Sequence, residues 1–294
     1  MALYKGTQKL EPIIFSSEVR GIYREVSTNG VYGAPSNNFS FKLPTGAINI
    51  GDYRLYGAFQ YCTGLTSVDL SSLTTLSGSH AMDYAFYYCT NLTSVDLSNL
   101  TTVSGNYTMQ RAFYGCTGLT SVDLSSLTTL SGSYAMQYAF DGCIGLTSVD
   151  LSNLTTVSGH QAMLCCFQKC TGLTSVDLSS LTTLSGMSAM QSAFQNCTGL
   201  TSISFPSLTT VSGHQAMRSA FQNCTSLTTL SFPALTSTSF GSYTNQFNSM
   251  LSGVTGCTVH FPSNLQSVIG LWTSVTNGFS GTNTTVLFDL PATT

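Results

Sequence analysis

A spacing of 27 residues governs most of this chain. Cysteines recur at this step, at Cys62, Cys89, Cys116, Cys143, Cys170, Cys197 and Cys224. Phenylalanines do the same, at Phe59, Phe86, Phe113, Phe140, Phe167, Phe194 and Phe221. A fixed period of roughly 20–50 residues is typical of solenoids, in which each unit buries its apolar side against its neighbours. The chain is therefore predicted to fold as a stack of similar turns.

Each unit divides into two pieces of local structure. LTSVDL (65–70) alternates apolar and polar residues, which is typical of a half-buried strand. SHAMDYAFYYC (79–89) places apolar residues at i, i+1, i+4, i+5 and i+8, which predicts a helix of about two turns. Units of this length with an L-x-x-L-x-L strand are typical of leucine-rich repeats.

The two pieces predict a curved shape. Paired strands lie about 4.8 Å apart, whereas packed helices need about 8–10 Å. The expected fold class is thus an α/β solenoid, a curved leucine-rich repeat right-handed superhelix with a concave parallel β-sheet and short convex helices. Strands centred near residues 42, 69, 96, 123, 150, 177, 204, 231 and 260 give nine rungs.

Three regions follow from the extent of the repeat. Residues 41–262 are expected to form the solenoid, and residues 1–40, which lack the repeat, an N-terminal cap. Residues 263–294 are expected to form a C-terminal cap. It would contain a short helix over NLQSVIGLW (264–272) and a strand over TTVLFDL (284–290).

Charge is scarce in this sequence. Only 7% of the residues are Asp, Glu, Lys or Arg and the net charge is -3, whereas a typical soluble domain is about 25% charged. This balance excludes a basic nucleic-acid binder and a polybasic membrane-surface protein. No apolar run approaches the roughly 20 residues of a membrane-spanning helix, and the first residues do not predict a secretory signal peptide.

The cysteine column is interpreted as reduced core. Zinc sites need close pairs of ligands, but only Cys165, Cys166 and Cys170 lie near one another, and all three belong to one unit. A ladder of disulfides would strain a curved stack, although individual bridges stay open. Free cysteine packs as a small hydrophobe. The cysteine and phenylalanine columns are thus expected to be structural, with no metal and no cofactor.

One polar column points outward from the predicted sheet. It consists of Lys42, Asp69, Asp96, Asp123, Asp150, Asp177, Ser204, Ser231 and His260. Carboxylates at strand spacing repel by roughly 1 kcal/mol in water and about 3.5 kcal/mol at an effective dielectric of 20. Two interpretations remain open: a solvated strand face copied by duplication, or a strip that binds a cationic or carbohydrate ligand. One carboxylate per rung supplies too few oxygens for a calcium site.

No catalytic arrangement emerges. His80, His160, His214 and His260 fall at unlike positions of the unit, so no Ser-His-Asp or His-metal cluster can be assembled. The chain is predicted not to be an enzyme.

The order of motifs resembles the BspA-like (Treponema pallidum-type) leucine-rich repeat family. CTSLTTLSFP (224–233), NCTGLTSISFP (196–206) and FKLPTGAINIG (41–51) followed by GAF (57–59) carry the resemblance over roughly residues 41–262. The unit exceeds the family's usual one by x-x-A-M, close to one helical turn. The resemblance implies bacterial surface or secreted proteins that bind host or microbial partners without catalytic residues.

The expected function is therefore a non-enzymatic binding or adhesion protein. It would use the concave leucine-rich repeat face to engage a protein or glycan ligand, with no nucleic acid and no membrane insertion. The alternative is a prophage-encoded virion component, a tail-associated receptor-binding or structural subunit. The resemblance implies the cell surface, the alternative implies the virion, and neither the ligand nor the oligomeric state follows from the sequence.

Overall fold

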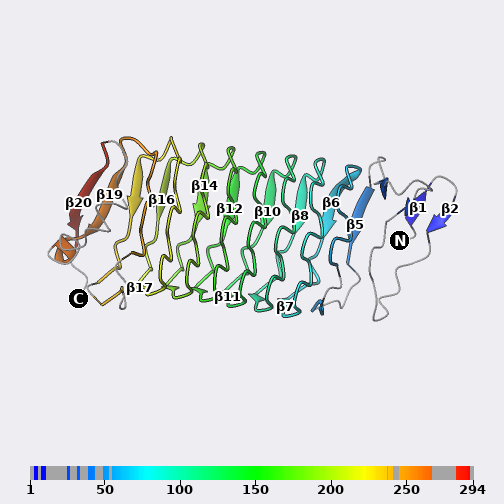
Figure 1. Cartoon of the computed structure of the whole chain (residues 1–294), viewed down its shortest axis with the longest axis horizontal. Helices are drawn as coiled ribbons and strands as arrows, with labels where there is room; N and C mark the ends of the chain where they lie inside the picture. Colours follow the sequence, from blue (N-terminus) through cyan, green and yellow to red (C-terminus); the bar gives the residue numbers. More distant parts are fainter. Residues whose placement is uncertain are drawn as a thin grey trace.

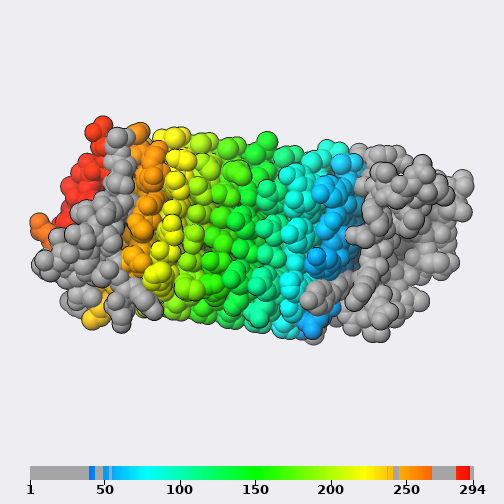
Figure 2. All heavy atoms as spheres, viewed as in Figure 1, coloured from blue at the N-terminus to red at the C-terminus, as the bar shows by residue number. Residues whose placement is uncertain are grey.

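The computed structural model describes residues 39–43, 49–52, 55–236, 238–240, 245–266 and 283–291, and four short strands nearer the N-terminus. Within these residues the chain is a parallel β-solenoid of about eight turns, lying side by side along one long axis (Figure 1). In space-filling view the turns form successive bands in contact (Figure 2).

Two ladders of parallel strands run along the solenoid. The first ladder forms the strand face and begins with β5 (Phe39–Lys42), β6 (Leu65–Asp69), β8 (Ser94–Asp96), β10 (Ser121–Asp123), β12 (Ser148–Asp150) and β14 (Ser175–Asp177). It resumes with β16 (Ser202–Ser204), β18 (Thr229–Ser231), β19 (Thr258–Pro262) and β20 (Thr285–Leu290). The second ladder joins β7 (Thr75–Leu76), β9 (Thr102–Val103), β11 (Thr129–Leu130), β13 (Thr156–Val157), β15 (Thr183–Leu184) and β17 (Thr210–Val211). Strand pairing keeps equivalent residues of successive units opposite one another, as in Val122↔Val149.

The two ends of the chain differ in part from the expected caps. β20 pairs in parallel with β19, so the strand ladder continues past residue 262 and past the nine expected rungs. The expected helix over 264–272 lies outside the described residues beyond the short 3-10 turn η1 (Ser263–Leu265) and Gln266. Near the N-terminus, β1 (Leu3–Lys5) pairs antiparallel with β2 (Gln8–Leu10), and β3 (Glu25–Val26) with β4 (Tyr32–Gly33). The capping role of both ends stays a prediction.

The prediction of convex helices is wrong. Residues 55–236 contain no α-helix, and 79–89 is a succession of turns. His80, Tyr84 and Tyr88, four residues apart, have left-handed φ values of 52°, 56° and 56°. The apolar spacing i, i+1, i+4, i+5, i+8 therefore reflects a period of four residues, not the 3.6 of an α-helix. The extra x-x-A-M of each unit adds one such four-residue step.

Hydrogen bonds explain why this segment is not a helix. The N–H of Met82 donates to the carbonyl of Thr108 in the next turn at 2.7 Å, and the N–H of Ala85 donates back to Met82 at 3.0 Å. Every second amide thus bonds across to the following turn. Because these backbone groups are used between turns, they are not available for the i→i−4 bonds of a helix.

These hydrogen bonds between turns also remove the difference in spacing from which a strongly curved solenoid was predicted. Both sides of the solenoid are laddered by backbone hydrogen bonds, so neither needs the 8–10 Å spacing of packed helices. In the core, consecutive phenylalanine rings stack 5.1 to 5.6 Å apart with interplanar angles of 3° to 6°. The side expected to be wide is thus nearly as tightly spaced as paired strands.

The cysteine column lies in the core beside these rings. The Sγ of Cys116 donates to the carbonyl oxygen of Phe86 at 3.2 Å, and five other cysteines repeat this contact. All ten cysteines are free and buried. Burial raises the pKa of the Cys62 thiol to about 11, which keeps it protonated and unreactive at neutral pH.

Candidate functional site

The strand face brings most of the predicted polar column together. Pairing places Lys42 opposite Asp69, and the five aspartates follow one another in register from Asp69 to Asp177. Beyond β14, Ser204, Ser231 and His260 form a second run in register. We call these nine positions the polar strip.

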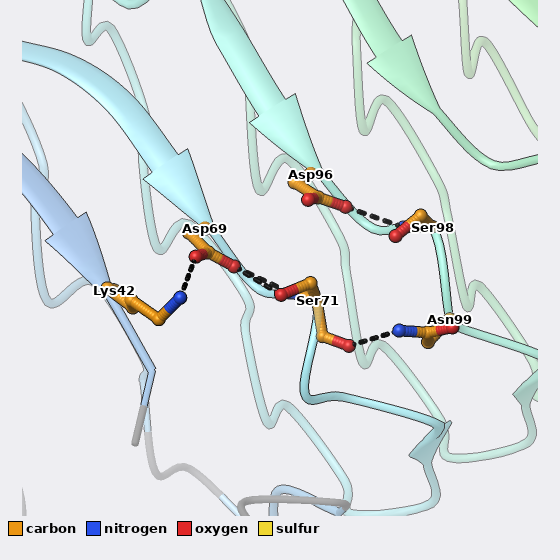
Figure 3. Close-up of polar contacts among 6 residues, drawn as sticks. All are labelled: Lys42, Asp69, Ser71, Asp96, Ser98 and Asn99. Carbon is orange, nitrogen blue, oxygen red and sulfur yellow. Dashed lines mark hydrogen bonds and ion pairs between the residues drawn. The ribbon is translucent and has the colours of Figure 1, made fainter. Parts of the chain in front are cut away.

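Each aspartate of the strip closes the turn that follows its strand. The N–H of Ser98 donates to Oδ1 of Asp96 at 3.0 Å, and that of Ser71 donates to Oδ1 of Asp69 at 3.1 Å (Figure 3). The same bond recurs at 2.9 to 3.0 Å in the units of Asp123, Asp150 and Asp177. This is an Asx turn, in which a side-chain oxygen mimics a backbone acceptor. One oxygen of each carboxylate is therefore committed to the fold.

The sequence explains which units carry an aspartate. The residue two places later is serine in all five Asp units, so an N–H is present to be accepted. In the units of Ser204, Ser231 and His260 that residue is Pro206, Pro233 or Pro262. Proline has no N–H, so an Asx turn cannot form there. The Asp–Ser pairing is thus a local folding device as well as a feature of the surface.

Basic side chains meet carboxylates at both ends of the strip. Nζ of Lys42 lies 2.5 Å from Oδ2 of Asp69 (Figure 3). The hydrogen bond from Lys42, with that from Ser71, lowers the pKa of Asp69 below its ordinary value. At the other end, Nδ1 of His260 lies 2.9 Å from Oδ1 of Asp289.

The strand ladder is interrupted between β14 and β16. No pairing joins these two strands, although every other pair of neighbours on the described strand face is paired. Val176 is only partly buried, whereas Val149 in the same column is 2% exposed. The break coincides with the change from Leu178 to Phe205 in the buried column after the strand, where a larger ring must fit beneath the sheet.

A shallow hollow of about 540 Å³ lies over this break. Asp150, Asp177 and several serines line it, and Val176 and Ile203 also contribute to its surface. The hollow was not expected from the sequence.

Two columns of threonines, one through Thr66 and Thr93 and one through Thr74 and Thr101, stabilise the contact between successive turns. Oγ1 of Thr93 donates to the carbonyl of Thr66 at 3.0 Å, and Oγ1 of Thr101 donates to that of Thr74 at 3.0 Å. Equivalent bonds continue along both columns. Since each of these hydroxyls donates to a carbonyl of the preceding unit, the columns do not form an array of unengaged donors.

The opposite side of the solenoid carries groups that the sequence interpretation overlooked. We define the turn face as the outward side chains of residues 79–89 and of their equivalents in the other units. It holds most of the tyrosines and two buried carboxyls, Asp83 and Asp141, each 2% exposed. Nδ1 of His80 lies 2.8 Å from Oδ2 of Asp83. The signal was present in the sequence, because these positions vary among units that are otherwise near-copies.

The buried Asp141 is expected to make stability depend on pH. Burial raises its pKa from 3.8 to about 6, opposed by Lys169 and Arg111. The folded state then holds the proton more tightly than the unfolded state, so the stabilisation is complete below pH 3.8 and is lost as the pH rises through 6. Urea unfolding from pH 4 to 7 is expected to show about 2 kcal/mol more loss of unfolding free energy in the wild type than in Asp141→Asn. Parallel pH profiles of the two proteins would contradict this assignment.

The described residues show no group of three or more His, Cys, Asp or Glu that could hold a metal ion. In the same residues, no helix has the length and apolarity needed to span a membrane.

Comparison with known proteins places the repeat. The profile of the BspA type leucine rich repeat region matches in six copies, over residues 29–137, 81–212 and 165–268. No curated protein matches. Among solved structures, a leucine-rich repeat protein of T. pallidum is 24% identical over 57% of this chain and 73% of its own, with a TM-score of 0.38. A leucine-rich repeat protein of Eubacterium ventriosum is 22% identical over 70% of this chain and 42% of its own, with a TM-score of 0.37.

The matched segments together cover far more than half of the sequence, and they span the parallel turns of the solenoid. Leucine-rich repeats of this kind are generally protein-binding scaffolds without enzymatic activity. This chain belongs to the BspA-type leucine-rich repeat family.

Proposed function

We propose that this protein is a non-enzymatic binding scaffold whose strand face engages a basic segment of a partner protein. The observation that carries the proposal is the ion pair between Lys42 and Asp69, because the chain's own ammonium group occupies the first carboxylate of the strip. A partner's lysines or arginines would occupy the following ones.

The remaining aspartates are suited to such contacts. Among the described residues no donor reaches Oδ2 of Asp96, Asp123, Asp150 or Asp177, while Oδ1 of each is held by its Asx turn. The Asx turns thus fix the carboxylates before a ligand arrives, which lowers the entropy lost on binding. Neighbouring carboxylates about 4.8 Å apart also repel one another, and a bound cation relieves that repulsion.

Charge complementarity of this kind acts on encounter and on specificity. Five of the twelve acids in the chain stand in the strip. The hollow between β14 and β16, flanked by Asp150 and Asp177, would take the longest side chain of the partner.

A synthetic 12-residue peptide of alternating lysine and serine tests the proposal by titration calorimetry at low and physiological salt. The triple variant Asp96→Asn/Asp123→Asn/Asp150→Asn is expected to bind at least tenfold more weakly than the wild type. Each asparagine keeps the acceptor oxygen of the Asx turn, so the fold is retained while the charge is removed. Binding to the wild type is expected to weaken as salt rises.

Asp52→Asn is the matched control, because Oδ1 of Asp52 accepts from the N–H of Ser79 away from the strip. It makes the same Asp-to-Asn change at one carboxylate and is expected to leave affinity unchanged. Equal binding by the wild type and the triple variant would refute the proposal, as would equal binding of a glutamate–serine peptide. A carbohydrate ligand on this face, and the role in a virion, stay predictions.

A further inference from the structure

The turn face differs from the rest of the molecule in how its residues vary. The strand face repeats Ser-Val-Asp unchanged through five units, from 67–69 to 175–177. On the turn face the position of Tyr84 is occupied in the following units by Arg111, Tyr138, Cys165 and Ser192. The inward residues of the same segments stay Ala, Met, Phe and Cys with few exceptions. Variation in this segment therefore falls mostly outside the Ala, Met, Phe and Cys columns.

The backbone makes several of these side chains unfavourable. Tyr84, Tyr88 and Arg111 have φ values of 56°, 56° and 51°, in the left-handed region where a side chain is disfavoured. Gly115 and Gly142 occupy the position of Tyr88 in later units and avoid that penalty. Bulky residues kept in a strained conformation indicate that the side chains themselves are used.

Tyrosines gather at the N-terminal half of this face. We define the tyrosine patch as Tyr56, Tyr61, Tyr84, Tyr87, Tyr88 and Tyr114. The rings of Tyr61 and Tyr88 stack 5.8 Å apart, and Tyr87 meets both edge-on. Tyr61 is 55% exposed and Tyr88 37% exposed. The patch is therefore pre-arranged by its own ring contacts and still open to a ligand.

Planar polar groups flank the patch. The guanidinium of Arg111 lies over the rings of Tyr84 and Tyr138, and its Nη1 donates to Oη of Tyr84 at 2.8 Å. Farther along the face, Nε2 of Gln168 donates to Oε1 of Gln195 at 2.6 Å. The face thus presents aromatic rings together with guanidinium and amide groups.

From Arg111 to Arg218 the accessible charges on the turn face are basic. Arg111, Lys169 and Arg218 are the three bases of residues 56–240, and all three lie there. Of the acids on this face, Asp83 and Asp141 are buried, and the exposed Asp52 lies in the first unit, away from these three bases. The turn face from Arg111 to Arg218 is therefore complementary to an anionic ligand, whereas the strand face is complementary to a cationic one.

We propose that the turn face binds an acidic polysaccharide. Phenol rings pack against the C–H faces of sugar rings, and guanidinium and amide groups form hydrogen bonds with their hydroxyls. The carboxylates of the polysaccharide would contact Lys169 and Arg218. Because each unit offers different side chains, the ligand is a polysaccharide whose sugar residues differ along the chain.

An array of defined glycans tests this proposal, with uronic-acid and sialic-acid chains beside neutral chains of matched length. The wild type is expected to bind acidic members, and Tyr61→Ala/Tyr88→Ala to lose at least tenfold in affinity. Tyr61→Phe/Tyr88→Phe keeps the rings and is expected to retain most of the binding. Lys169→Gln/Arg218→Gln is expected to lower affinity for acidic chains only.

Circular dichroism and thermal melting establish that each variant is folded. If the alanine pair is not folded, the Lys169→Gln/Arg218→Gln pair supplies the answer, and undiminished binding of acidic chains by it overturns the proposal. The strand-face variant Asp96→Asn/Asp123→Asn/Asp150→Asn is expected to bind glycans as the wild type does, which separates this site from the one proposed above. The proposal is overturned by equal binding of acidic and neutral chains, by undiminished binding in a folded alanine variant, or by no glycan binding at all. A protein partner that competes for the patch in place of any glycan would also overturn it.

Discussion

Replacement of Phe140 by alanine is expected to cost about 3–5 kcal/mol of unfolding free energy. Its ring is fully buried and stacks on Phe113 at 5.2 Å and on Phe167 at 5.3 Å. Truncation would remove both stacks and leave a cavity that ladders on two sides prevent from collapsing. Urea unfolding followed by circular dichroism measures the loss.

Phe288→Ala is the matched control for this experiment. Phe288 is only partly buried and stacks on Phe261 at 6.0 Å. Since a solenoid is stabilised by interfaces between neighbouring units, a ring near one end contributes less than a central one. A loss below about 1.5 kcal/mol for Phe140→Ala would contradict the picture of a continuous aromatic column.

Replacement of Gly132 by alanine is expected to be similarly damaging, at about 3 kcal/mol or more. A Cβ built on Gly132 lies 2.1 Å from the carbonyl oxygen of Gly105 and 2.7 Å from its carbon. These are backbone atoms of the preceding unit, so they cannot move aside without opening the ladder. Thermal melting of the purified variant measures the effect.

Ser131→Ala provides the comparison, because it alters an exposed side chain next to the glycine. Its melting temperature is expected to match that of the wild type, since surface changes rarely exceed about 0.5 kcal/mol. If Gly132→Ala melted like Ser131→Ala, the close approach of successive glycines would be wrong.

The repeat predicted those parts of the fold that follow from the pattern of apolar and polar side chains, namely the strands and the core columns. Alternation of Val68 and Leu70 with polar residues placed the strands, and the 27-residue columns placed Phe59 and Cys62 in the core. The convex helices failed because periods of 4 and 3.6 residues place apolar positions alike over two turns. Gly115 and Gly142 each occupy one of the left-handed positions that recur every four residues within a unit, and they were the clue to this backbone. Tyrosines at the same position in neighbouring units concealed the clue.

The candidate site was predictable only in outline. The line of aspartates could be read from the sequence, and so could the exchange of Ser179 for Pro206 that explains where it stops. That these aspartates also accept hydrogen bonds in Asx turns became visible only from the geometry of the backbone. The break between β14 and β16 coincides with the change from Leu178 to Phe205, but residue types alone do not reveal that two strands part there.

The left-handed residue at every fourth position of the turn face also limits how the number of residues per turn of the solenoid can change. An insertion or deletion of four residues in the turn face adds or removes one complete step and leaves every inward side chain inward. One, two or three residues would instead turn the apolar residues out and the polar residues in. The turn face can therefore lengthen only in increments of four residues, whereas the 29-residue unit in which Ser231 pairs with His260 shows that the rest of the circumference can take up two extra residues.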